Sequence, residues 1–363
     1  MTKKWSSRLT FFAFVVLMVG LGSNDSLRGI FSTIFQEHFS LTTTQLGLIV
    51  TASYIGNLVF LLVGGNLSTR FSKKRVLQVL ILIWMAALAL FAFTSNYTVL
   101  LIGMALALGS STLLNTTMNL ITPLLFATAP GFFVNFLFFT QEIGTSGSQY
   151  ILGSHADGFA FWQHTNLVLL ILGAVAFVLL LFCNVPEEAA DPADTPAQKG
   201  GYDWRIIVPY VLVFGFYFIA EHGVMNWMVA YGVDGLGLPQ ASAAKYLSVF
   251  FGGMMIGRLC LSPLVDKLGA LKSLAAFGGV SCVLYLIGSL GGAVTMPVWA
   301  ISGLSFSILY PTLVMSIRLY FPAQQVSGAA GTILSIASLA DILFNVGFGK
   351  LVDMAGYAVS IRV

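Results

Sequence analysis

The stretch VPYVLVFGFYFIAEHGVMNWMVAY, residues 208–231, decides the fold of this chain. It is long enough and apolar enough to form a helix that crosses a membrane. Glu221 and His222 nevertheless lie near its middle. A carboxylate at the centre of a bilayer costs about 2.5–3.5 kcal/mol on insertion scales, so it faces protein or water rather than lipid. The stretch therefore indicates either a helix that ends at the headgroups near Glu221, or an ion or substrate site within a bundle of membrane helices. The apolar sequence on both sides favours the second interpretation.

The composition of the whole chain agrees with a membrane protein. Of 363 residues, 57% are hydrophobic and only 9% are charged, and the mean hydropathy is +0.90. Soluble domains carry about 25% charged residues. No cleavable signal peptide is apparent, because the apolar run after Arg8 is too long and lacks a small-residue cleavage site. The composition predicts an all-α polytopic membrane protein that does not bind nucleic acid.

Apolar runs of about 20 residues predict eleven membrane helices. Their approximate bounds are 9–35, 45–67, 76–94, 97–125, 131–154, 164–185, 206–233, 241–261, 273–290, 297–321 and 327–351. A twelfth helix would follow Gly356, but the remaining residues are too few to cross a bilayer. We therefore expect the given sequence to end before a last helix that is missing or incomplete.

Lysines and arginines predict how the helices are oriented. They gather before the first helix, between the second and third, and between the eighth and ninth, whereas the loops at 95–96 and 291–296 contain none. All three groups lie on one side of the membrane if the N-terminus is cytoplasmic. We expect a multi-pass protein of the inner (plasma) membrane with that orientation.

The chain is predicted to consist of two related halves. Residues 186–203, PEEAADPADTPAQKGGYD, have the composition of a cytoplasmic linker, which separates an N-terminal bundle at 1–185 from a C-terminal bundle at 204–363. Asp25 and Glu221, in the first helix of each half, are 196 positions apart. Thr69 and Asp266, in corresponding loops, are 197 positions apart. Two features with nearly the same period indicate parallel six-helix repeats.

The loop GNLSTRFSKKR, residues 65–75, resembles the cytoplasmic signature of the major facilitator superfamily. Thr69 stands in the place of the family's Asp, and the second-half loop instead keeps Asp266. The resemblance implies a major facilitator fold, with two six-helix bundles related by a pseudo-two-fold and a cargo site between them. It also implies that a set of charged loop residues latches one conformational state: Arg70, Lys73, Lys74, Arg75, Asp266 and Lys267.

More narrowly, the chain resembles the fucose permease-like group of sugar–proton symporters. The similarity is spread over six segments: NDSL at 24–27, NTTMN at 115–119, QEIG at 141–144, YFIAE at 217–221, GRL at 257–259 and YPT at 310–312. This resemblance implies that Asp25 takes part in proton coupling. Asn115 falls where the fucose permease has a second proton-linked glutamate, so a relay of two carboxylates would require another acidic residue.

Proton coupling requires a group that can be charged or neutral within the membrane, and burial in a low-dielectric environment poises a carboxylate for this role. The candidates are Asp25, Glu142, Glu221 and Asp341, and more weakly His222. Arg28 lies one turn from Asp25, so an alternative is a buried ion pair that braces the first helix. For the other carboxylates the alternative is a hydrogen bond between helices, and for His222 it is a bond to a backbone carbonyl.

Recognition of a sugar requires amides or carboxylates for the hydroxyl groups and aromatic rings for the C–H face. Asn115 and Asn119 share one helix face, and so do Asp341 and Asn345. Several buried amides that converge on a cavity suggest a polar cargo. The candidate substrate-binding residues are Asn115, Asn119, Gln141, His222, Asn226, Trp227, Tyr310 and Asn345. The alternative is that each amide joins helices and that Trp227 is a packing residue.

The sequence therefore predicts a secondary transporter, not an enzyme, that takes up a sugar or similar solute with protons and rocks between two states. We expect no cofactor and no metal, since neither a nucleotide-binding loop nor a metal-ligand spacing is present. The expected partners are a small-molecule substrate, the proton and the lipid bilayer, with the protein monomeric. Two alternatives remain: a proton-driven exporter of amphipathic compounds, and a sensor that has a transporter fold but does not transport.

Overall fold

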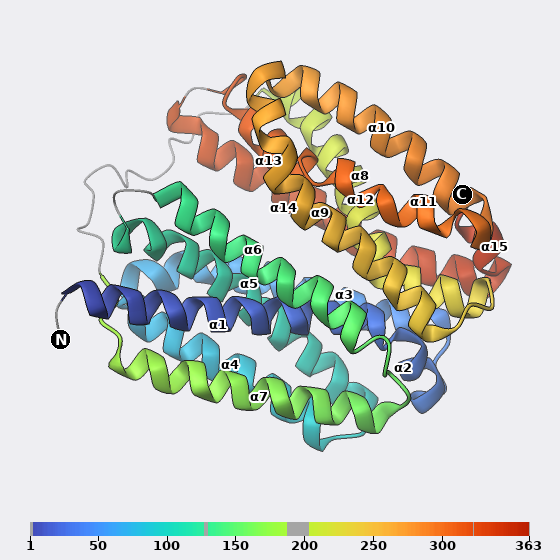
Figure 1. Cartoon of the computed structure of the whole chain (residues 1–363), viewed down its shortest axis with the longest axis horizontal. Coiled ribbons are helices and arrows are strands. Elements are labelled where there is room, and N and C mark those ends of the chain that lie inside the picture. Colours follow the sequence, from blue (N-terminus) through green and yellow to red (C-terminus); the bar gives the residue numbers. More distant parts are fainter. Residues whose placement is uncertain (1–2, 127–129, 187–202, 322, 363) are drawn as a thin grey trace. The chain divides into compact units, whose positions relative to one another are not determined.

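The computed structural model describes residues 3–126, 130–186, 203–321 and 323–362, and all of its regular elements in these ranges are helices (Figure 1). The predicted linker lies almost entirely outside the described residues. Contacts divide the chain into two compact units, Met1–Ala189 and Ala190–Val363.

The first unit contains seven helices. Long helices alternate with short connections, and the short α2 follows α1 after a single residue. Their bounds are α1 Lys3–Ile30, α2 Ser32–Phe39, α3 Thr43–Arg70, α4 Lys73–Phe93, α5 Tyr97–Leu125, α6 Pro130–Ile151 and α7 Phe159–Phe182.

The second unit contains four long helices and several short ones. The long helices are α8 Trp204–Ala230, α9 Gln240–Leu268, α10 Ala270–Leu290 and α14 Ala323–Ala355. The short elements are η1 Tyr231–Gly235, η2 Gly292–Thr295, α11 Met296–Ile301, α12 Gly303–Phe306, α13 Leu309–Ile317 and α15 Tyr357–Ser360.

Ten helical segments of the described chain are long and apolar enough to cross a membrane. They coincide with ten of the eleven predicted spans. The remaining prediction, 131–154, corresponds to α6, which is a helix but is not among the ten. The polar residues that follow Phe139 in α6, TQEIGTSGSQ, make it the least uniformly apolar of the predicted spans.

Two predicted spans were wrong in their continuity. The span 9–35 is two helices, because α1 ends at Ile30 and α2 begins at Ser32. The span 297–321 is divided into α11, α12 and α13. At these breaks serine hydroxyls bond to the carbonyl three residues earlier: Ser32 to Gly29 at 2.8 Å, Ser302 to Trp299 at 2.6 Å, and Ser307 to Leu304 at 2.7 Å. Such bonds compete with the regular helical pattern and bend helices.

The two units pair their helices in the same order. In the first unit α1 packs on α6 and α3 on α5, and in the second α8 packs on α14 and α9 on α12. Small residues bring the backbones together. A Cβ on Gly56 would collide with the backbone of Ala105, and a Cβ on Gly257 would meet the Leu304 carbonyl at 2.5 Å. Close approach at small residues is the usual way in which membrane helices associate.

Candidate functional site

One face of α5 carries three polar side chains, Ser111, Asn115 and Asn119, at intervals of four residues. Ser111 Oγ donates a hydrogen bond of 3.2 Å to Asp25 Oδ2 on α1. Asn24 Nδ2 lies 3.4 Å from the other carboxylate oxygen, Asp25 Oδ1. Both carboxylate oxygens of Asp25 therefore accept hydrogen bonds from neutral groups.

The two asparagines of α5 continue into a chain of amides that reaches α6. Asn119 Nδ2 donates to Asn115 Oδ1 at 2.6 Å, and Asn115 Nδ2 donates to Gln141 Oε1 at 2.6 Å. We call Asn119, Asn115 and Gln141 the amide chain. It joins two helices and brings three of the predicted substrate-binding residues together.

Glycines set the distance between α1 and α6. A Cβ on Gly22 would collide with the backbone carbonyl of Gln141, and a Cβ on Gly144 would collide with that of Val19. Thr145 Oγ1 also donates to the Gly22 carbonyl at 3.2 Å. This close packing fixes α6, which carries one end of the amide chain, against α1, which carries Asp25.

Arg28, one turn after Asp25, is buried and interacts electrostatically with it. Its guanidinium carbon also lies 5.3 Å from the centre of the Tyr54 ring, which is the geometry of a cation–π contact. Glu142 is only partly buried. It directly follows Gln141, so its side chain leaves the helix about 100° around the axis from that of Gln141. The amide chain thus includes Gln141 rather than the acidic residue beside it.

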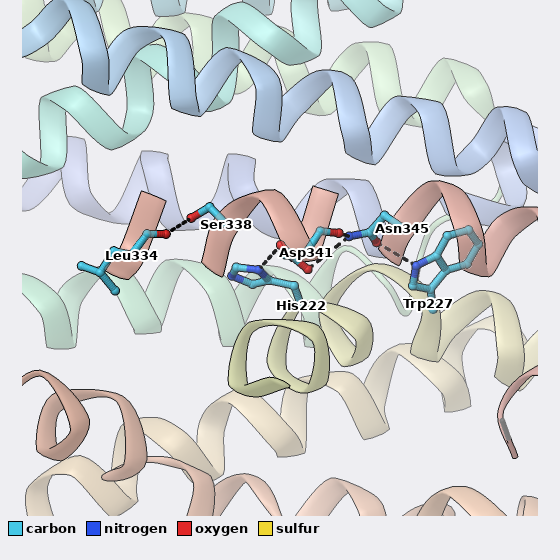
Figure 2. Close-up of polar contacts among 6 residues, drawn as sticks. All are labelled: His222, Trp227, Leu334, Ser338, Asp341 and Asn345. Atoms are coloured by element: carbon cyan, nitrogen blue, oxygen red, sulfur yellow. Dashed lines mark hydrogen bonds and ion pairs between the residues drawn. The ribbon is translucent and has the colours of Figure 1, made fainter. Parts of the chain in front are cut away.

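The second unit contains another polar network, between α8 and α14 (Figure 2). His222 Nδ1 and Asp341 Oδ2 are 2.7 Å apart. Asn345 Nδ2 lies 3.3 Å from Asp341 Oδ1, and Trp227 Nε1 donates to Asn345 Oδ1 at 2.9 Å. We call His222, Asp341, Asn345 and Trp227 the His222 network. Asp341, Asn345 and Trp227 are almost completely buried.

Aromatic residues of α8 and α13 pack next to His222. The Phe218 ring lies parallel to the His222 ring, with centroids 5.5 Å apart. The ring centroid of Tyr310, on α13, lies 5.8 Å from that of Tyr217 and 6.1 Å from that of Phe218. Glu221, next to His222 in the sequence, interacts electrostatically with both tyrosines. Its contacts are therefore with the aromatic residues.

The structure describes the side chains of Asn226 and of four of the six predicted latch residues. Asn226 is buried beside Trp227 in α8. Lys74 Nζ donates to the carbonyls of Leu181 and Cys183 at 2.9 and 2.8 Å, so it caps the C-terminal end of α7 within the first unit. Lys73 and Arg75 begin α4, and Lys267 is exposed near the end of α9. The side chains of Arg70 and Asp266 lie outside the described part of the structure.

Two residues that contact these candidate sites, Ser111 and Phe218, are not among the residues predicted from the sequence. Ser111 has the four-residue spacing to Asn115 that could have identified it, and Phe218 has the same spacing to His222. In the part of the chain that the structure describes, no three His, Cys, Asp or Glu side chains gather where they could hold a metal ion.

Comparison with known proteins identifies the family. A family model described as Major Facilitator Superfamily matches residues 10–345. The chain is 24% identical to the L-fucose-proton symporter of Escherichia coli (strain K12) over 333 residues, 80% of this chain and 75% of that protein. It is 26% identical to the glucose/galactose transporter of Brucella abortus biovar 1 (strain 9-941) over 341 residues, 88% of this chain and 81% of that protein.

A solved structure gives the same fold. The crystal structure of the transporter FucP in the outward conformation matches with a TM-score of 0.66 and 19% identity, covering 98% of this chain and 96% of that one. These relatives are transporters, not enzymes. With its ten apolar spans, the chain is a multi-pass membrane protein that belongs to the major facilitator superfamily of transporters.

Proposed function

We propose that this protein is a secondary transporter that takes up a sugar or similar small polar solute together with protons. One observation carries the proposal. The partly buried carboxylate of Asp25 is bonded to Ser111, on the same face of α5 as the asparagines of the amide chain. A group that can be protonated and a set of groups suited to a polyhydroxylated cargo thus belong to one polar surface.

The chemistry of the amide chain supports a polar cargo. An amide both donates and accepts hydrogen bonds, so it can serve a hydroxyl group in either role. Within a membrane protein such groups are costly unless they have partners. In this structure Asn119 donates to Asn115, and Asn115 donates to Gln141. A sugar would exchange these bonds for bonds to its hydroxyls. The names of the two relatives, which mention L-fucose, glucose and galactose, point to the same class of cargo.

The role proposed for Asp25 follows from the cost of its charge. An ionised carboxylate deep in the membrane is costly, whereas its protonated form is neutral. The bonds from Ser111 and Asn24 and the field of Arg28 support the ionised form. Binding a proton together with the cargo would neutralise the carboxylate of Asp25. The protein could then expose the substrate to one side of the membrane and then to the other, which is alternating access.

The topology belongs to the same proposal. The distribution of lysine and arginine supports a cytoplasmic N-terminus in the inner membrane, and we propose a monomer in which the two units are the moving parts. Asn226, Tyr310 and Glu142 remain candidates for contact with cargo or proton. Lys73, Arg75 and Lys267, with Arg70 and Asp266, remain candidates for the latch.

Transport by the purified protein in proteoliposomes tests this function. We expect an inward proton gradient to concentrate labelled L-fucose, D-glucose or D-galactose. Asp25→Asn should abolish accumulation but leave exchange of labelled for unlabelled sugar at least partly intact. Asp157→Asn, at an exposed position in the loop before α7, is the matched control. Unchanged accumulation in Asp25→Asn would remove this residue from the mechanism.

Two other outcomes would favour the alternatives. If no sugar of a broad panel moves or stabilises the protein while hydrophobic cations do, the protein is an exporter. The aromatic residues Tyr217, Phe218 and Tyr310 would then form the binding surface for such a cargo. If a sugar binds but shows no exchange, the protein is a sensor with a transporter fold.

A further inference from the structure

The donors and acceptors of the His222 network have one consistent arrangement (Figure 2). The indole nitrogen of Trp227 can only donate, so the Asn345 atom that it contacts is the carbonyl oxygen. The amide nitrogen of Asn345 then faces Asp341, and donates both to its backbone carbonyl at 2.9 Å and to Oδ1 at 3.3 Å. An asparagine held in this way presents a donor to the carboxylate of Asp341.

The tautomer of His222 follows from an ionised Asp341, the state that we assign to this carboxylate. An ionised carboxylate only accepts hydrogen bonds. At 2.7 Å from Asp341 Oδ2, the Nδ1 atom of His222 is therefore the donor, and Nε2 is the nitrogen that can gain a further proton. Ser338, one turn earlier on α14, bonds to the Leu334 carbonyl at 2.8 Å.

Exposure also distinguishes the two members of the pair. The side chain of Asp341 is 3% exposed, whereas that of His222 is 24% exposed. Of the two groups, the imidazole is therefore the one with a side-chain surface that protein does not cover. Phe218 covers one face of the imidazole, and its parallel ring holds His222 in place from the same helix.

The charge of the pair changes when His222 is protonated. With a neutral imidazole the pair carries the single negative charge of the buried carboxylate. With an imidazolium it is a neutral ion pair, which is less costly inside a membrane. One proton therefore removes the net charge from this pair.

We propose that His222 is a second proton-binding site of the transport cycle, with Asp341 as its positioning residue and counter-charge. The proton binds at Nε2 of the imidazole, no covalent bond to carbon forms or breaks, and the same proton leaves on the other side of the membrane. The inference rests on the proposed function, because a proton site drives transport only in a proton-coupled carrier.

The remaining charges near His222 come from several helices. Glu221 is its neighbour on α8, and Arg258 of α9 acts on the same tyrosines, Tyr217 and Tyr310, as Glu221 does. From α10, Tyr285 Oη donates to the Ala220 carbonyl at 3.2 Å. Glu221 and Arg258 carry opposite charges, so their effects on these two tyrosines oppose one another. Asp341 lies in direct hydrogen-bond contact with His222.

Nuclear magnetic resonance of labelled histidine tests the inference without any cargo. The other three histidines, His38, His155 and His164, are exposed. A protein with all three changed to glutamine keeps His222 as its sole imidazole. In lipid nanodiscs we expect its ¹⁵N signals to titrate between about pH 5 and pH 9, with the proton on Nδ1 above the midpoint.

Two variants in this background test the role of Asp341. Asp341→Asn should move the midpoint to lower pH by about 1–3 units, because the imidazolium loses its counter-charge. Asp353→Asn, an exposed carboxylate on the same helix, should not move it. A shift no larger than that of the control would overturn the assignment of Asp341.

If Asp341→Asn does not fold, titration of His222 with Asp341 intact still tests whether His222 is a proton-binding site. An imidazole that does not titrate in this range, or one protonated on Nε2 above its midpoint, would overturn the proposal. In proteoliposomes, His222→Gln should lower the number of protons taken up per L-fucose, and an unchanged number would also overturn it. Absence of any sugar transport would instead contradict the proposed function and leave the titration as measured.

Discussion

Ser111 Oγ and Asp25 Oδ2, 3.2 Å apart and 86 positions apart in the sequence, join α5 to α1 within the first unit. The hydroxyl is itself fully buried. A hydrogen bond to a charged group contributes about 1.5–3 kcal/mol, more than a bond between neutral groups. Ser111 therefore acts on the carboxylate proposed to bind the proton, although it carries no charge of its own.

Replacing Ser111 by alanine should impair coupling more than binding. We expect Ser111→Ala to reduce sugar accumulation by about tenfold, because about 1.4 kcal/mol corresponds to one factor of ten, while sugar exchange changes less. The control is Ser110→Ala, a buried neighbour whose hydroxyl bonds to the Leu106 carbonyl of its own helix at 2.6 Å. Equal effects of the two variants on the ratio of accumulation to exchange would contradict the role of Ser111.

The amide chain predicts a different kind of defect. Asn115→Ala removes both the acceptor of Asn119 and the donor to Gln141. We expect it to weaken sugar binding by about tenfold or more, because each unmatched polar group in a buried site costs about 1–3 kcal/mol. Binding of L-fucose to detergent-solubilised protein, followed by thermal shift, gives the measurement.

Thr116→Ala is the matched control for that change. Thr116 is exposed and bonds to the Thr112 carbonyl of its own helix at 2.9 Å. It should bind the sugar as the unaltered protein does. If Asn115→Ala binds equally well, the asparagines join helices and do not contact cargo.

Much of the fold could be predicted because membrane helices are apolar over their whole length. The predicted span 97–125 coincides with α5, and the span 273–290 ends where α10 ends. The breaks at Phe31 and Ser302 could not be predicted, because they involve neither proline nor a polar loop. They accompany serine hydroxyls that bond to the helix backbone, and serines elsewhere in the chain make such bonds without ending a helix.

The candidate sites could be predicted as residues but not as pairs. Hydrophobicity identified Asp341 and His222 as unusual, and helical spacing placed Asn345 on the face of Asp341. That His222 bonds to Asp341, 119 positions away, depends on how α8 packs on α14. Periodicity within one helix contains no information on that packing. The same reason explains why Asp25 was considered beside Arg28 on its own helix, and not beside Ser111 of α5.

The glycines between α1 and α6 should be sensitive to a single added methyl group. Gly144→Ala would push a Cβ against the Val19 carbonyl, whereas Gly147 of the same helix has nothing within 4 Å of such an atom. We expect Gly144→Ala to lower the stability of the protein by about 1–3 kcal/mol, the usual cost of overpacking, and Gly147→Ala to leave it unchanged. Thermal unfolding of both variants in the same detergent measures this, and equal melting temperatures would contradict the close contact.

Trp227 provides a test of the buried end of the His222 network. Trp227→Phe keeps an aromatic ring against Phe348, whose centroid is 5.0 Å away, but removes the donor to Asn345. A buried acceptor left without a donor costs about 1–3 kcal/mol, so the melting temperature should fall. Trp204→Phe, at an exposed residue that begins α8, is the control and should have little effect.

Histidine resonances should also report the loss of the Trp227 donor. Asn345 without this bond no longer fixes Asp341, so the His222 signals should broaden. A stable variant with sharp, unshifted signals would mean that the indole packs in the second unit without supporting the pair of His222 and Asp341.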